Sequence, residues 1–158
     1  METAYAERYA NVGHQLDLHA GIVFSCLLKQ GPFSELGDVA CVSVAPVDHD
    51  GFTIKLDVHH VKVVGAFAHA FSRDESGSYL YGVLDFKRVN EMGTPYGDPL
   101  VRVVIDDLGN CGWRGGFANL HTAVPAGPSE GRVFRRGILH LLRLKVLEYL
   151  AEHALKPE

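Results

Sequence analysis

Histidine is the residue type in this chain whose abundance first suggests chemistry. The 158 residues include nine histidines, and imidazole serves proteins both as a metal ligand and as a general base. None of the specific ligand spacings occurs: the sequence has no HExxH, no CxxC and no Cys/His quartet at zinc-finger intervals. The one metal-like grouping that a hairpin could assemble is His49 and His69 with Asp48 and Asp50. An exposed turn rich in aspartate explains this grouping equally well, so we expect neither a metal nor another cofactor.

A glycine-rich run, Gly112-Trp113-Arg114-Gly115-Gly116, is the second place where the sequence suggests a site. Glycines weaken a strand unless it bends or a ligand approaches its backbone. The run lacks the strand-to-helix context of a phosphate-binding loop, so it does not predict nucleotide binding. We expect a sharp bend that lets the sheet curl around the C-terminal helix. The alternative is a ligand that rests against Trp113 and the glycine backbone, with Arg114 paired to its anionic group.

Nucleophilic catalysis finds little support in the sequence. The three cysteines, Cys26, Cys41 and Cys111, are widely spaced and lie in apolar contexts, where a thiol behaves as a small hydrophobic group. His19 and Cys26 share a helix face but lie about 10.5 Å apart along the axis, which is too far for a thiolate–imidazole contact. No GxSxG elbow supports a serine nucleophile. The sequence therefore predicts reduced cysteines and no catalytic residue, and it favours a non-enzymatic protein.

Two long helices are predicted to hold the rest of the chain in place. From Thr3 to Gln30, apolar residues recur at steps of four and three, with Gly13 as a point where the helix could divide. Gly31 and Pro32 are expected to end this segment. The second helix is predicted from Arg132 to Ala154.

Between the helices the sequence predicts about six antiparallel strands. The clearest hairpin joins Val39–Val47 to the strictly alternating segment Phe52–Val58 through Asp50-Gly51. Afterwards the apolar positions change from even to odd numbers, which implies either a bulge or a tight connection at His59-His60. The remaining strands are predicted over residues 61–71, 79–88, 100–106 and 111–121.

The C-terminal helix carries more apolar surface than one sheet contact requires. One broad face is expected to pack on the sheet, and a second group that includes Leu141, Leu144 and Leu147 lies on another side. A helix that packs only on a sheet needs one such face. The second face is therefore predicted to meet the N-terminal helix or another subunit.

Composition and charge narrow the class of protein. With 47% hydrophobic and 22% charged residues, residues 1–158 are expected to form one globular α+β domain. The net charge of −4 argues against nucleic acid as a partner. The cluster Arg132, Arg135, Arg136 and Arg143 is interpreted as a solvated helix face. No signal-like segment and no apolar run of membrane-spanning length is found, so the chain is expected to be cytoplasmic.

Two functional hypotheses follow from these features. The first is an interaction module that docks through the second face of the C-terminal helix, most simply as a homodimer. The second is a binding protein or enzyme for a small apolar ligand, held in a cavity between the curved sheet and that helix. The predicted order of elements resembles the architecture of helix-grip ligand-binding domains, without their opening strand. The second hypothesis depends on a group of aromatic side chains: Phe67, Phe71, Tyr79, Tyr81, Phe86, Trp113 and Phe117.

Overall fold

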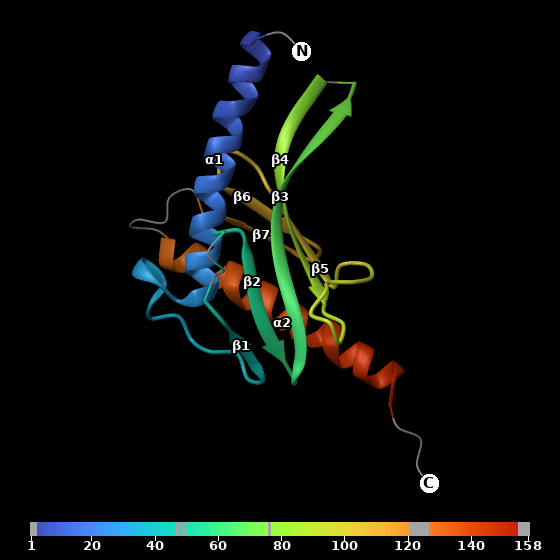
Figure 1. Ribbon diagram of the computed structural model, residues 1–158. Helices are drawn as coiled ribbons and strands as arrows, with labels where there is room; N and C mark the ends of the chain where they lie inside the picture. The colour runs from blue at the N-terminus through green and yellow to red at the C-terminus, as the bar shows by residue number, and fades with distance from the viewer. Residues whose placement is uncertain (1–2, 47, 49, 76, 121–126, 155–158) are drawn as a thin grey trace.

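Two long helices and a curled antiparallel sheet make up the fold, which confirms the predicted α+β class (Figure 1). The computed structural model describes residues 3–46, 48, 50–75, 77–120 and 127–154. The helices are α1 (Thr3–Leu28) and α2 (Gly127–Glu152), with a short 3-10 helix η1 (Gly31–Phe33) after the first. Both helices contact the sheet and each other, so the sheet wraps around them as a half-open barrel.

The sheet is a simple meander in which each strand pairs with its sequence neighbours. In chain order the strands are β1 (Val42–Val44), β2 (Thr53–Val58), β3 (Val61–Asp74), β4 (Gly77–Arg88), β5 (Val101–Ile105), β6 (Asn110–Trp113) and β7 (Gly116–Asn119), all antiparallel. The two longest strands, β3 and β4, form a hairpin whose tip extends along α1 (Figure 1).

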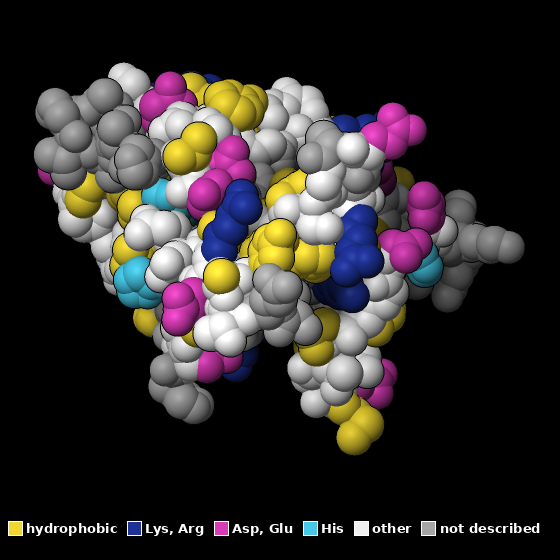
Figure 2. Space-filling view, turned by 90° about the horizontal axis from the view of Figure 1, so that it is seen from above, with side chains coloured by type: hydrophobic (Ala, Val, Ile, Leu, Met, Phe, Trp, Pro, Cys, Tyr) yellow, Lys and Arg dark blue, Asp and Glu magenta, His cyan; other side chains and the backbone are white. Residues whose placement is uncertain are grey.

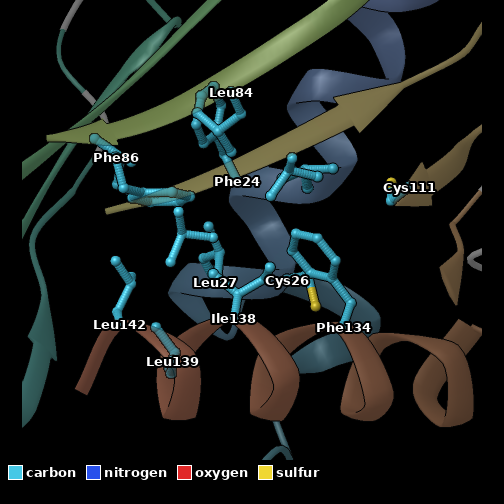
Figure 3. Close-up of a cluster of buried hydrophobic side chains, with 14 of the residues drawn as sticks. Phe24, Cys26, Leu27, Leu84, Phe86, Cys111, Phe134, Ile138, Leu139 and Leu142 are labelled. Atoms are coloured by element: carbon cyan, nitrogen blue, oxygen red, sulfur yellow. The ribbon is translucent and has the colours of Figure 1, made fainter. Parts of the chain in front are cut away.

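The core lies between the inner face of the sheet and the two helices. On α2, the side chains of Ile138, Leu139 and Leu142 are fully buried and approach Leu84 and Phe86 of β4 (Figure 3). Alternation places every second strand residue on this inner face. Gly65 of β3 leaves room there for the Phe86 ring, because a Cβ at this position would lie 2.7 Å from the ring. The sheet can thus close tightly over α2.

The first helix is continuous, whereas Gly13 suggested a division. Leu16, Ala20, Val23 and Leu27 follow one face at steps of four and three and are buried. Gly13 lies within this helix and faces the His69 ring of β3. A Cβ at position 13 would lie 3.0 Å from that ring, so glycine leaves room for it.

The end of α1 also differs in detail from the prediction. Lys29 adopts the left-handed conformation, with φ of 59°, before Gly31 is reached. The amide of Gln30 donates to the carbonyl of Ser25, and that of Lys29 donates to Cys26. This pattern is the Schellman motif, formed here without glycine at the left-handed position.

The change of phase at His59-His60 is a tight connection between β2 and β3. Both residues have positive φ, 49° and 65°, as a two-residue type I′ turn requires. The Asp57 carboxylate accepts a hydrogen bond from the His60 amide at 2.9 Å, which stabilises the turn.

The predicted strand over 111–121 is wrong as a single element, because a hairpin divides it into β6 and β7. Arg114 and Gly115 form the turn, and Gly115 has φ of 94°, a conformation that glycine adopts readily. This hairpin raises the number of strands in the described sheet to seven. His121 lies outside the described residues.

Candidate functional site

The outward face of α2 is the first candidate site. Leu144 and Leu147 are 51% and 44% exposed, whereas Val146 between them is fully buried. Leu141 is partly buried against the core and lies at the edge of this face. Of Leu141, Leu144 and Leu147, which the sequence places in a second apolar face, the structure therefore leaves Leu144 and Leu147 open to solvent.

Trp113 of the glycine run is partly buried and packs against the core. Its indole contacts the Phe134 ring edge-to-face, with centroids 5.6 Å apart. A Cβ on Gly116 would lie 2.2 Å from this indole, and one on Gly137 of α2 would lie 2.6 Å from it. Gly116 and Gly137 thus accommodate the tryptophan ring between β7 and α2, a role that the sequence alone did not indicate.

Arg114 lies at the tip of the β6–β7 hairpin and borders a groove of about 660 Å³. The groove runs between the C-terminal half of α2 and the segment that leads into β5. Its lining carries both signs of charge, with Arg88 stacked 3.8 Å above the Tyr149 ring. Arg102 is bound through its Nε to Asp85 at 2.7 Å, whereas Arg114 makes no ion pair within the described part of the chain. Arg114 is therefore available to an anionic group.

The histidines are dispersed over the fold. His69 binds Asp17 of α1 through a contact of 2.8 Å between Nε2 and Oδ1. Asp48 instead faces Lys55, and the Asp50 carboxylate accepts a hydrogen bond from the Phe52 amide. His49 lies outside the described residues. Among residues that are described, no group of three or more His, Cys, Asp or Glu side chains is placed to hold a metal ion.

Two of the three cysteines are unreactive. Burial raises the pKa of both Cys26 and Cys111 to about 12, so their thiols stay protonated at neutral pH. The Cys26 thiol donates to the carbonyl of Gly131 at 3.2 Å, which ties α1 to the start of α2. Cys41 is exposed and, like the others, is a free thiol.

An exposed aromatic patch lies at the end of the molecule formed by α1 and the β3–β4 hairpin. Tyr9 contacts Phe71 edge-to-face at 5.2 Å, and Tyr79 is tilted against Tyr81. Figure 2 shows hydrophobic side chains beside lysine and arginine side chains on this end. Because Phe71 and Tyr79 are exposed here while Phe86 is buried in the core, the seven aromatic residues of the ligand hypothesis do not surround one cavity.

Comparison with known proteins gives no functional assignment. No family model matches the chain, and neither a curated protein nor a solved structure gives a significant match. Within the described residues, no helix combines the length and apolar character needed to cross a membrane.

Proposed function

We propose that this chain is a non-enzymatic interaction module that acts as a homodimer through the outward face of α2. The observation that carries the proposal is the exposure of Leu144 and Leu147 on the side of α2 opposite its buried face. Exposed leucines that lie together on one helix face mark interaction surfaces, whereas scattered ones are ordinary.

The spacing of residues along this face favours another helix as its contact. Leu144, Leu147 and Ala151 are exposed and follow one another at steps of three and four. This is the spacing of a two-helix seam, whose contact positions are mostly apolar. We call these residues the α2 stripe.

Charges beside the α2 stripe favour a second copy in a parallel arrangement. Arg143 and Glu148 flank the stripe on opposite edges and are five positions apart. In parallel helices such edge positions face each other across the seam, so Arg143 of each copy would meet Glu148 of the other. An antiparallel pair would bring edges of the same kind together. A two-fold dimer satisfies both pairs at once.

The test is the double substitution Leu144→Glu and Leu147→Glu, followed by light scattering. We expect a folded monomer, because the substitutions bury like charges at a symmetric contact. Leu108→Glu is the matched control, since Leu108 is an exposed leucine in the β5–β6 turn, where the neighbouring Asp107 carbonyl is bound by His19 of α1. An unchanged mass for the double variant contradicts the dimer, and global unfolding would assign the two leucines to the core.

Crosslinking tests the arrangement itself. In a parallel dimer Leu144 lies opposite its own copy, so Leu144→Cys in a Cys41→Ser background should form an intermolecular disulfide on oxidation. Cys26 and Cys111 are buried and should not interfere. The Leu108→Cys variant, with its cysteine at an exposed position, measures the background rate of disulfide formation.

We also assign the dimer to the cytoplasm. The three free cysteines support this assignment, because an exposed thiol such as Cys41 persists where glutathione and thioredoxin keep thiols reduced.

A second candidate function is small-ligand binding in the groove beside Arg114. Its volume of about 660 Å³ supports the idea, since it falls in the range of small-molecule sites. Arg114→Ala should then abolish ligand binding and leave the melting temperature unchanged, whereas a purely structural groove predicts no effect on any ligand. Native mass spectrometry of the purified protein and its variant distinguishes the two.

A further inference from the structure

A second pocket, of about 330 Å³, lies between the N-terminal half of α2 and the loop that follows η1. Positively charged and imidazole side chains form its α2 wall, and backbone with one carboxylate forms the other. The lining consists of Leu36, Gly37, Asp38, Val39, Arg132, Arg135, Arg136 and His140. The pocket thus gathers three of the four arginines that the sequence placed on a solvated helix face.

Arg135 is a buried charge on this wall. It is 5% exposed, and its guanidinium donates to the backbone carbonyls of Leu27 and Gly37. A carboxylate oxygen of Asp38 lies 4.0 Å from the guanidinium. Burial lowers the pKa of Arg135, yet an arginine stays protonated in proteins. The pocket wall therefore carries a positive charge that is solvated mainly by carbonyl groups.

Arg132 and Arg136 border the same pocket one helical turn apart, and both are exposed. Within the described part of the chain, neither makes an ion pair. Asp38 does not offset them, because it is 81% exposed and its carboxylate binds Lys29 at 3.0 Å. Two positive charges at the pocket therefore lack a counter-charge among the described residues.

His140 completes the cluster as a hydrogen-bond donor. Its Nδ1 lies 2.9 Å from a guanidinium nitrogen of Arg143. A guanidinium can only donate, so Nδ1 accepts and the proton of the neutral ring is on Nε2. Desolvation, Arg143 and Arg136 all lower the pKa of this imidazole, which keeps the ring neutral. The remaining N–H is the group that His140 can offer to an acceptor.

We propose that this pocket binds the dianionic phosphate group of a small soluble phosphate monoester. A phosphate monoester carries a charge of about −1.5 to −2 near neutral pH, which matches the two uncompensated guanidinium groups. Arginine donates in a planar fork that fits phosphate oxygens, and such charge-assisted bonds are about twice as strong as neutral ones. The volume exceeds that of several waters at about 30 Å³ each, so a phosphate fits together with part of the group that it esterifies.

The pocket lining does not include Leu144 or Leu147 of the dimer contact proposed above, although Arg143, which flanks that contact, also binds His140. Leu144 and Leu147 lie in the C-terminal half of α2, whereas Arg132 and Arg135 lie in the N-terminal half. Phosphate binding can therefore be measured on the Leu144→Glu, Leu147→Glu variant as well as on the unaltered protein, so the failure of one proposal leaves the other testable.

The first experiment follows His140 by NMR during titration with inorganic phosphate, with chloride at equal ionic strength as the reference. A bound dianion should raise the pKa of His140 saturably, because it offsets the positive charges of Arg136 and Arg143. Asp38 is the acidic group that faces His140 across the pocket, and it is present in both titrations. The NMR signals of His153, just beyond the C-terminal end of α2, should not respond to phosphate. Equal shifts in phosphate and chloride would overturn the proposal.

The second experiment measures phosphate affinity directly by calorimetry for Arg132→Gln and Arg136→Gln. Each should weaken binding about tenfold or more, as expected for the loss of one charge-assisted contact. Arg73→Gln, an exposed arginine on β3, is the matched control and should bind as the unaltered protein does. Because both pocket arginines are exposed, the variants should fold normally; unchanged affinity in folded variants refutes the site.

The source of the phosphate group is tested with glycerol phosphate and with vesicles that contain phosphatidic acid. A soluble ester should bind at least as tightly as inorganic phosphate, because the rest of the pocket gains contacts. Binding to vesicles without measurable binding of either soluble probe would overturn the proposal in favour of a membrane surface.

Discussion

The two sides of α2 show how one helix can serve stability on one face and recognition on the other. Its inner face contributes Phe134, Ile138, Leu139, Leu142 and Val146, all fully buried. Its outer face carries Leu144 and Leu147, which contribute little to the fold because water still reaches them. Chemically similar side chains one or two positions apart therefore have different roles, and the difference is set by the angle at which each leaves the helix.

Matched truncations on the two faces should give the largest contrast. Leu142→Ala should lower the free energy of unfolding by about 2–5 kcal/mol, because it leaves a cavity in the core. Leu144→Ala should change it by no more than about 0.5 kcal/mol in the monomer. Chemical denaturation of both variants in the Leu147→Glu background measures the two values without a contribution from association. Equal losses would show that the outer face is part of the core.

The next largest expected effect is a loss of stability on substitution at the edge of α2 that contacts Trp113. Gly137→Ala brings a methyl group to within 2.6 Å of the indole, which also packs edge-to-face against Phe134 of the same helix. We expect a loss of about 1–3 kcal/mol from overpacking. Gly112→Ala is the matched control in the same glycine run, since a Cβ there meets nothing within 4 Å. Thermal unfolding should separate the two variants.

A double-mutant cycle gives the control for this mechanism. In a Trp113→Ala background the methyl group of Gly137→Ala has room, so its cost should largely disappear. If Gly137→Ala destabilises both backgrounds equally, helix geometry rather than the indole contact is responsible.

The sequence predicted those parts of the fold that obey a regular period. Strict alternation located the strand that begins near Phe52, and the shift to odd positions located the turn at His59-His60. The alternation rule failed at the glycine run, because glycine has no side chain and so does not indicate which face of the strand is buried. The turn at Gly115 therefore went unrecognised, and β6 and β7 were merged.

Of the candidate sites, too, one could be predicted from a regular period in the sequence and one could not. The exposed leucines of α2 were predicted because both faces of a helix are encoded within one short segment. The pocket beside Arg135 was not predicted, since its other wall comes from Gly37, a position 98 residues away in the sequence and in a loop without periodicity. Any residue type can supply a backbone carbonyl, so the sequence does not indicate which carbonyls bind a guanidinium.

The smallest expected effect concerns pH and the charged edge of α2. Because the pKa of His140 is lowered from 6.5 in the folded protein, the unfolded chain binds a proton more readily between 6.5 and the lower folded value. Stability should therefore fall as pH decreases through this window and be highest above it.

Arg143→Gln removes one cause of the lowered pKa, so the pKa of His140 should rise towards 6.5 and the stability of the variant should decline less on acidification. Arg136 and Arg132 on α2 and Asp38 in the facing loop remain as neighbouring charges. The variant also loses a hydrogen bond from Arg143 to the carbonyl of Ala40, which shifts its stability equally at all pH values and leaves the slope interpretable. NMR titration of His140 measures the pKa directly, with His153 as the internal reference. A pKa that does not rise in Arg143→Gln would show that desolvation and Arg136 keep the ring neutral without Arg143, and that the charge of Arg143 is not coupled to this edge of α2.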